Sequence, residues 1–378
     1  MTEFIPGITL CGLFFREVVK PIVDAGFPDL RYDAGLFGYG SEVLGYDTPR
    51  SMDHNWGLRV RLIVSEADYP QTADAIKDLL RRQLPVEYRG YSTDYSRADT
   101  DGSSHPASGE LGNIQHLVTV ETMRGILWDH MRLKPDTPMR IVDWLTIPQQ
   151  HLLEMTSGEV YQSTLGDLPR IRQQFAYYPD EVWKYLLACA WMRISQEEPF
   201  VGRTGEVGDN LGSAVIGARL VRDLMRLCFL IERRYAPYSK WFGTAFSRLA
   251  CGPLLTPIFQ RVLNATTWQE REQPLSEAYH HVAEMQNALA ISEPVTADVS
   301  PFWGRPFQVI HGDHFAESIL KTLPEGEMRT IARRTRIGGI DQYTDNTDLI
   351  ENPDLRDALT RLYFEGSAFG STLGTVKP

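Results

Sequence analysis

The chain has 378 residues, of which 43% are hydrophobic and 23% are charged, and its formal net charge is −11. This composition is typical of a folded globular chain long enough for two domains. The excess of acidic residues argues against an extended surface for nucleic acid. No apolar run approaches the length of a membrane span, and the opening residues MTEFIPGITL lack the basic start of a signal peptide. We therefore expect a cytoplasmic protein that does not bind a membrane, and the sequence leaves its oligomeric state open.

The first 125 residues show the pattern of a small mixed α/β domain. Apolar residues recur with the helical period in two segments and form short β-branched or aromatic runs in four others. A loop is expected at 95–113, where apolar residues are few. The expected helices cover 9–25, with an interruption near Pro21, and 69–84; the expected strands cover 31–37, 58–64, 86–92 and 114–122.

From residue 121 onward the pattern becomes helical and stays so, which predicts a larger α-helical domain. The expected helices cover 121–132, 143–156, 179–196, 211–235, 238–250, 268–290, 312–322 and 353–364. The predicted fold class is therefore α+β. A small mixed α/β domain occupies residues 1–125, and an α-helical domain occupies residues 126–378.

The connection between the first two expected strands is longer than a reversal of direction requires. It reads LFGYGSEVLGYDTPRSMDHNWG and combines glycines, serines and acidic residues. Gly40 and Ser41 can bring backbone N–H groups to a phosphate, and two carboxylates separated by one residue on a strand can share a metal ion. Asp53 and Asn55 follow Gly40-Ser41 after a spacer of eleven residues. Such a turn and acidic pair serve the Mg²⁺-dependent transfer of a nucleotidyl group.

The stretch GSEVLGYDTPRSMDHNWG resembles an uncharacterised bacterial family of nucleotidyltransferase-like proteins, whose members carry GSE, GxD and S-x-D-H-D-W-G. Glycine-serine, a spacer of this length and D-x-[D or E] before an apolar strand form the signature of the nucleotidyltransferase superfamily. The resemblance continues through YYPDEVWKYLLACAW, QEEPFVGRTGEVGDNLGS, ARLVRDLMR and RRYAPYSKWFGTAF, so it covers most of the chain. It implies a nucleotidyltransferase-type fold joined to an α-helical domain.

The activity expected with this resemblance is transfer of a nucleotidyl group from an NTP, with ATP expected, to an unknown acceptor. The net charge of −11 favours a small-molecule acceptor over a long polyanion. The cofactor would be Mg²⁺ or Mn²⁺. Asp53 and Asn55 would bind the metal and, with Glu121, would form the catalytic set. The residues expected to bind the nucleotide are Gly40, Ser41, Glu42, Ser51 and Lys240; Glu42 and Asp47 are also candidates for an auxiliary acid or base. The acceptor and the base preference are left open.

The sequence departs from the family pattern at the residues that carry the chemistry. Asn55 stands where the family has its second acid, and an amide oxygen offers Mg²⁺ no negative charge. The place of the third acid is taken by Thr119, with Glu121 two residues further on. A second hypothesis is therefore a catalytically degenerate protein of the same fold that binds a nucleotide or a partner.

Two segments of the expected helical domain are candidates for the acceptor side. Residues 200–213 gather glycines, Arg203 and Asp209 before a long helix, a pattern that fits a capped helix start and a ligand contact equally well. Residues 233–243 mix basic and aromatic side chains, which fit a phosphate and base site or the rim of a bundle helix. We expect Arg203, Asp209 and Lys240 to face the Gly40–Asp53 turn across an interdomain cleft.

Two further segments suggest a different enzyme, a small-molecule kinase. VIHGDHFAESIL contains His-Gly-Asp, but Ser318 stands where a kinase loop has Asn, and no glycine-rich loop with a partner lysine precedes it. We interpret HGDH as a helix N-terminus with Asp313 near the cap. GGIDQYTDNTD, residues 338–348, is interpreted as an acidic turn-rich loop, and it is the next place to seek the acceptor site.

Cysteine and histidine spacing predicts neither a disulfide framework nor a zinc site. Cys11, Cys189, Cys228 and Cys251 are scattered within apolar helical patterns, which indicates reduced thiols in the core. The nine histidines show no HExxH pattern or similar pairing.

Overall fold

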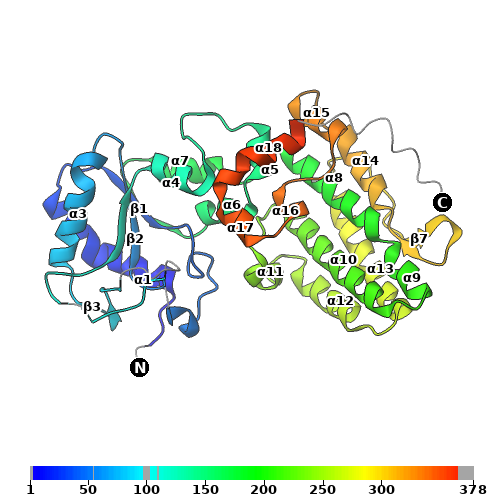
Figure 1. Ribbon diagram of the computed structural model, residues 1–378, viewed down its shortest axis with the longest axis horizontal. Helices are drawn as coiled ribbons and strands as arrows, with labels where there is room; N and C mark the ends of the chain where they lie inside the picture. Colours follow the sequence, from blue (N-terminus) through cyan, green and yellow to red (C-terminus); the bar gives the residue numbers. More distant parts are fainter. Residues whose placement is uncertain (1–2, 54, 97–102, 109, 365–378) are drawn as a thin grey trace. The chain divides into compact units, whose positions relative to one another are not determined.

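The computed structural model describes residues 3–53, 55–96, 103–108 and 110–364 (Figure 1). The chain folds into two compact units. The first comprises residues 1–138 and 151–176, and the second comprises residues 139–150 and 177–378. The chain combines one small mixed sheet with many helices, so the predicted α+β class is confirmed.

The first unit is built on a four-stranded sheet in the order β5-β2-β1-β6. Strand β1 (Tyr32–Leu36) runs antiparallel to β2 (Arg59–Val64) and to β6 (Glu159–Ser163), whereas β5 (Leu117–Glu121) runs parallel to β2. The parallel register places Arg61 beside Thr119 and Ile63 beside Glu121. Because side chains alternate along a strand, this register puts Arg61, Thr119 and Glu121 on the same face.

The two faces of this sheet have different chemistry. Even-numbered residues such as Ala34, Leu62 and Val118 are buried in an apolar core with residues of α1 to α3. The opposite face is polar near its centre. Helix α7 packs close to this face, because a Cβ atom built on Gly35 of β1 would lie only 3.2 Å from the side chain of Leu168 on α7. Figure 1 shows α3 and α7 on opposite sides of the sheet.

The helices of the first unit close around these two faces. Asp33, which is fully buried on the polar face, accepts hydrogen bonds from Ser163 Oγ and from the backbone N–H groups of residues 165, 166 and 168, and thereby anchors the start of α7. The helical elements are α1 (Gly7–Phe14), a wide π turn (Phe15–Val19), α2 (Lys20–Gly26), a 3₁₀ turn (Pro49–Asp53), α3 (Tyr69–Gln83), α4 (Met123–Met131) and α7 (Asp167–Gln174), together with most of α6 (Gln149–Thr156).

Up to residue 364, the second unit is helical apart from one small hairpin and its connecting loops. Its centre is formed by α8, α10, α13 and α14, where Trp191 stacks on Phe315 with ring centroids 4.3 Å apart. The larger helices are α8 (Asp180–Glu197), α10 (Asn210–Ile231), α11 (Ser239–Phe246), α12 (Gly252–Asn264), α13 (Trp268–Ala288), α14 (Gly312–Lys321), α15 (Glu327–Arg334) and α18 (Arg356–Phe364). The shorter elements are α5 (Ile141–Thr146), α9 (Phe200–Glu206), β7 (Ser300–Pro301), a 3₁₀ turn (Phe302–Gly304), β8 (Gln308–Val309), α16 (Ile340–Tyr343), α17 (Thr347–Glu351) and a 3₁₀ turn (Pro353–Leu355).

The structure differs from the sequence interpretation at several places, and α7, α9, α12 and α15 are helices that the sequence did not predict. The single strand expected at 86–92 is a hairpin of β3 (Glu87–Tyr88) and β4 (Tyr91–Ser92), because Arg89 and Gly90 both have positive φ and close a tight turn. The helix expected at 143–156 is broken before Pro148, which cannot donate a helical hydrogen bond. The helical pattern expected after residue 121 is interrupted by β6, and pairing with β1 brings residues 151–176 into the first unit. The division between the units thus lies elsewhere than the boundary expected at residue 125.

Two expectations about the whole chain can be compared with the described residues. All four cysteines are buried free thiols, as predicted. None of the helices in the described part of the chain is long and apolar enough to cross a membrane.

The junction between β1 and β6 depends on a glycine. Gly158 has φ +73, and a Cβ there would lie 1.9 Å from the Leu36 carbonyl oxygen. We expect Gly158→Ala to lower the free energy of unfolding, measured in urea, by at least about 2 kcal/mol more than Gly166→Ala does. Gly166 has φ +91 but open space around it, so its replacement should cost only the left-handed backbone strain of about 1–2 kcal/mol. Equal effects of the two changes would contradict this account of the junction.

Candidate functional site

The segment between β1 and β2 forms a glycine-rich turn followed by a 3₁₀ turn. Gly40 has φ +126, a conformation that favours glycine, and Ser41 is half-buried beside it. Ser51 accepts a hydrogen bond from the Thr48 N–H at 3.0 Å, and Asp53 is the last residue of the 3₁₀ turn. Asp53 and Asn55 therefore precede β2, which begins at Arg59, so the pair lies just before the strand that the sequence expected at 58–64.

Glu42 is paired with a buried arginine. Its carboxylate lies 2.8 Å from the Arg59 guanidinium, and both side chains are almost wholly buried. Burial raises the pKa of Glu42, although the charge of Arg59 opposes that shift. A Cβ built on Gly40 would lie 2.6 Å from a carboxylate oxygen of Glu42. The carboxylate thus occupies the space beside Gly40.

Asn55 and Asp47 also have protein partners. Asn55 has φ +52, and its side-chain oxygen accepts a hydrogen bond from the Ser104 N–H at 2.9 Å, while its own N–H donates to the Ser104 carbonyl. Asp47 accepts hydrogen bonds from the Gly7 N–H at 2.7 Å and from the indole of Trp56 at 2.9 Å. In this arrangement both side chains stabilise the connection.

Glu121, at the end of β5, forms a bidentate ion pair with Arg61. The two hydrogen bonds measure 2.9 and 2.8 Å, and the Thr119 hydroxyl donates a third at 2.6 Å. Burial by itself raises the pKa of Glu121, but the charge and hydrogen bonds of Arg61 outweigh it, so the pKa lies below its ordinary value. Glu121 also lines a 350 Å³ hollow together with Lys77 and Arg81.

Two histidines lie close to this ion pair and were not singled out by the sequence. His130 of α4 and His151 of α6 meet edge to face, with ring centroids 6.3 Å apart. Burial, aided by the charge of Arg61, lowers the pKa of His130 to about 4. Burial also lowers the pKa of His151, whose Nδ1 has no hydrogen-bond partner among the described residues. Only tertiary folding brings these residues together, and their sequence spacing carries no signal.

The residues predicted for the acceptor side belong to the second unit. Asp209 caps α10 by accepting a hydrogen bond from the Gly212 N–H at 2.7 Å, which confirms the helix-cap interpretation. Arg203 is exposed and forms a 3.6 Å ion pair with Glu206. Lys240 is exposed at the start of α11, beside the Trp241 ring. Whether these residues face the Gly40–Asp53 turn stays a prediction.

The glycines at 200–213 have a packing explanation. A Cβ on Gly202 would lie 2.3 Å from the Phe307 ring, and one on Gly205 would lie 2.3 Å from Trp268. In the neighbouring 233–243 segment, Arg233 lies over the Trp183 ring at 3.6 Å, and Tyr235 is buried. These contacts account for the composition of both segments without a ligand.

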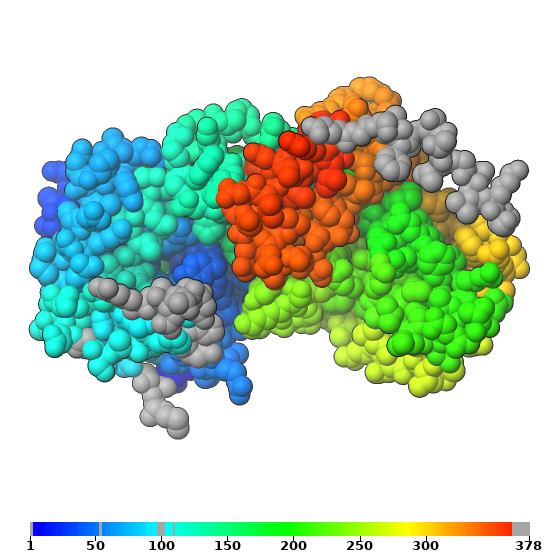
Figure 2. Space-filling model, in the orientation of Figure 1, coloured from blue at the N-terminus to red at the C-terminus, as the bar shows by residue number. Residues whose placement is uncertain are grey.

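A cavity of about 900 Å³ opens within the second unit, between α8, α10 and the segment from α15 to α16. Figure 2 shows the orange segment around 330–345 beside the green helices on the visible face. We call it the arginine cavity, because its lining includes Arg193, Arg219, Arg222, Arg333, Arg334 and Arg336. Asp223, Asp341 and Asp345 are its acidic lining residues, and Asp345 belongs to the 338–348 loop.

The arginines of this cavity are oriented by acidic side chains but remain partly exposed. Arg222 contacts Asp345 at 2.7 Å with 42% of its side chain exposed, and Arg219 contacts Glu197 at 2.7 Å with 52% exposed. Arg193 lies 3.6 Å from Asp223. Burial raises the pKa of Asp223 and of Asp341, although nearby arginines oppose both shifts. Arginine recurs on α10 and again in the last turn of α15 and just after it. This recurrence was the available sequence signal, and it was missed because the segments are far apart in the chain.

His-Gly-Asp lies at the start of α14, as the sequence predicted. The helix begins at Gly312, with His311 before it and Asp313 in its first turn. Ser318, which stands at the Asn position of a kinase loop, donates a hydrogen bond to the Glu293 carbonyl at 2.8 Å.

Comparison with known proteins gives limited information. The model of a family described as "Domain of unknown function (DUF4037)" matches residues 144–242. That range includes Arg203, Asp209 and Lys240, as well as the cavity-lining parts of α8 and α10, but not the Gly40–Asp53 turn. No curated protein matches the chain.

One solved structure resembles the chain weakly. It is a nucleotidyltransferase-like protein from Exiguobacterium sibiricum 255-15, with 11% sequence identity and a TM-score of 0.32 over 73% of this chain and 75% of that one. This similarity is too low to show a shared fold or activity.

The depressed pKa of His130 predicts a pH-dependent stability. Its folded pKa of about 4 lies below the unfolded value near 6.5, so the neutral folded form contributes full stability above pH 6.5. That contribution is lost as the pH falls from 6.5 towards 4. We expect His130→Gln to flatten the fall in the free energy of unfolding over this window by roughly 2 kcal/mol, measured by urea denaturation. Replacement of the exposed His280 is the control, and a His130→Gln curve parallel to the wild type would contradict the assignment.

Proposed function

We propose that this protein binds a phosphate-bearing small molecule, with an NTP as the leading candidate, in the arginine cavity. The observation that carries the proposal is the concentration of six arginines against three aspartates around one cavity, in a chain whose net charge is −11. Glu197, Glu317 and Glu325 also pair with arginines of the lining. The feature that attracts an anion is therefore the partly exposed guanidinium surface gathered around one cavity.

The chemistry of the lining suits phosphate. The guanidinium group presents a planar fork of donors that matches phosphate oxygens bidentately. Arg219 and Arg222 are already oriented by carboxylates, which lowers the entropic cost of fixing them around a ligand. Since both side chains remain partly exposed, an incoming phosphate can contact them directly.

The size and the remaining lining suit a mononucleotide better than a longer chain. The volume of about 900 Å³ lies within the range of small-molecule sites. Met192, Ile337 and Tyr343 add apolar and aromatic surface on which a base or another organic group can pack. An extended nucleic acid would instead need a basic surface beyond the cavity, which the overall charge disfavours.

Calorimetric titration of ATP, GTP and inorganic triphosphate into the full chain tests this proposal. We expect Arg222→Ala and Arg336→Ala, which alter lining residues from two different segments, each to weaken binding about tenfold or more, because a charge-assisted hydrogen bond contributes about 1.5–3 kcal/mol. The affinity of Arg222→Lys for these ligands should lie between the affinities of Arg222→Ala and the wild type, because lysine keeps the charge but not the planar fork of donors. Arg305→Ala, an exposed arginine outside the lining, is the matched control. Triphosphate binding that survives both alanine changes would exclude the cavity as the phosphate site.

A second candidate function is Mg²⁺- or Mn²⁺-dependent nucleotidyl transfer from ATP at the Gly40–Asn55 connection. Its support is the order of elements: a turn with Gly40 at positive φ, then Asp53 shortly before β2, with β5 parallel to β2. Gly40, Ser41 and Ser51 would hold the nucleotide, and Asp53 would bind the metal. Lys240 would contact phosphate, and the acceptor would lie on the side of Arg203 and Asp209.

The contacts of this connection favour the degenerate form of that candidate. The two other acids proposed for catalysis already form ion pairs: Glu42 pairs with Arg59, and Glu121 pairs with Arg61. Asn55 brings no charge, and its oxygen already accepts a backbone hydrogen bond. Binding of two Mg²⁺ ions needs several carboxylate oxygens, and these partners compete for them.

Asp53 and Asn55 variants separate the two candidates. If the connection is a transferase site, Asp53→Ala abolishes transfer from labelled ATP in the presence of Mn²⁺, and Asn55→Asp increases it by adding a second carboxylate. If the cavity alone binds nucleotide, Asp53→Ala leaves ATP affinity unchanged while Arg222→Ala lowers it. Activity that is insensitive to Asp53→Ala and Asn55→Asp would rule out the connection as a catalytic site.

A further inference from the structure

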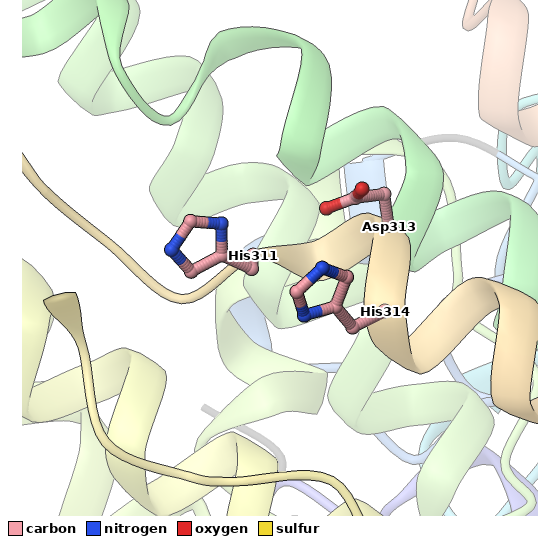
Figure 3. Close-up of side chains that lie close together, drawn as sticks. All are labelled: His311, Asp313 and His314. Carbon is pink, nitrogen blue, oxygen red and sulfur yellow. The ribbon is translucent and has the colours of Figure 1, made fainter. Parts of the chain in front are cut away.

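A group of three metal-ligating side chains lies at the start of α14, and none of the three lines the arginine cavity. His311, Asp313 and His314 each offer one ligand atom, and these atoms lie within 4.8 Å of one another. Figure 3 shows the Asp313 carboxylate turned towards the side on which the two imidazole rings lie. The rings are nearly parallel, with centroids 5.2 Å apart.

We propose that His311, Asp313 and His314 bind a divalent transition-metal ion, with Zn²⁺ as the leading candidate. Two imidazole nitrogens and one carboxylate oxygen form a donor set that suits Zn²⁺, Co²⁺ and Ni²⁺. Mg²⁺ prefers oxygen ligands in an octahedral arrangement, so this site is chemically distinct from the Mg²⁺ site considered at Asp53. Three protein ligands leave a coordination position for water.

The ring of His311 is held in a suitable orientation by a neighbouring strand. Its Nε2 lies 2.8 Å from the Ser300 hydroxyl on β7. If Nε2–H donates to this hydroxyl, Nδ1 carries the free lone pair, and Figure 3 shows one ring nitrogen on the side of Asp313 and the other directed away. Such a hydrogen bond to the second nitrogen is the usual support of a metal-bound histidine.

The backbone of the site is fixed by a buried carboxylate. Glu198, which follows α8, accepts hydrogen bonds from the N–H groups of residues 310, 311 and 312, at 2.7, 3.2 and 3.3 Å. Only the Gly312 N–H belongs to α14, and the other two N–H groups lie in the turn that leads into the helix. Glu198 therefore holds the turn in place, while Asp313 supplies the negative group on the ligand side.

The arrangement needs only a small adjustment to close around an ion. With metal–ligand bonds of about 2.0–2.2 Å, neighbouring ligand atoms lie roughly 3.4 Å apart, which is closer than the present upper separation of 4.8 Å. His314 is exposed, so its ring can rotate without repacking the core. The half-buried His311, which is tied to Ser300, forms the fixed part of the site.

Isothermal titration of ZnCl₂, CoCl₂ and NiCl₂ into the untagged full chain, freed of metal by chelator, tests this proposal. We expect one ion per chain, a visible-range absorption band with Co²⁺, and a raised melting temperature in each metal. His314→Ala and Asp313→Asn should remove this binding, and both lie at accessible positions where the fold can be checked by the melting temperature of the metal-free chain. Ser300→Ala should weaken binding about 10- to 100-fold, as loss of a supporting hydrogen bond does.

His280 and His281 supply the matched control, because they form another histidine pair whose rings lie 5.8 Å apart, with Asp298 3.6 Å from His280. His280→Ala should leave the binding of one ion unchanged. Stoichiometric binding that persists in His314→Ala, or the absence of Zn²⁺ binding in the wild-type chain, would overturn the proposal. Asp53→Ala should not alter Zn²⁺ affinity, so failure of this site and failure of the nucleotide proposals are distinguishable.

Discussion

The first unit depends on pairing two arginine charges that emerge from one face of β2. Arg59 and Arg61 point away from the apolar core, into a region that is nonetheless largely closed to water. A guanidinium in such a place is stable only when oxygen acceptors replace its lost hydration. Arg59 is satisfied by Glu42 and by two backbone carbonyls, and Arg61 by both oxygens of Glu121. The conformation of the glycine turn and of the end of β5 follows from that requirement.

In the second unit arginine is used differently. The guanidinium groups of Arg219 and Arg222 contact carboxylates at the edge of a cavity and keep part of their surface in water. Arg219 and Arg222 can therefore still contact a ligand from solvent, whereas Arg59 and Arg61 are almost fully enclosed by protein groups. An ion pair that is half solvated can exchange one acceptor for a phosphate oxygen at modest cost, whereas breaking a buried pair leaves an uncompensated charge. This difference in solvation is the physical basis for assigning ligand binding to the cavity.

The donor atoms at each place select different ligands. Guanidinium groups favour phosphate, carboxylates before a strand favour Mg²⁺, and imidazoles beside a carboxylate favour Zn²⁺. Glu198, which lies behind His311, and Asp33, which anchors α7, are buried carboxylates whose hydrogen bonds all come from the described protein groups around them. We therefore assign both carboxylates a structural role.

Structural features that depend on neighbouring residues could be predicted from the sequence, whereas features that depend on contacts between distant segments could not. Strands β1, β2 and β5, helix α3 and most helices of the second unit were predictable, because apolar periodicity records which face of a local element is buried. The cap at Asp209 and the helix start at His-Gly-Asp were also predictable, since both rest on neighbouring residues. Strand β6 was missed because its five residues acquire strand structure through pairing with β1, more than a hundred residues away.

The sequence by itself determined the α+β class, the reduced cysteines and the presence of a glycine-rich connection between the first two strands. Only the tertiary structure decided which charges are paired. It placed Glu121 on Arg61, gave Asn55 a backbone partner, and gathered arginines from three distant segments around one cavity. The physical reason is that a residue type specifies what a side chain can bind, whereas burial and partners, which are set by contacts between distant segments, specify what remains available to a ligand.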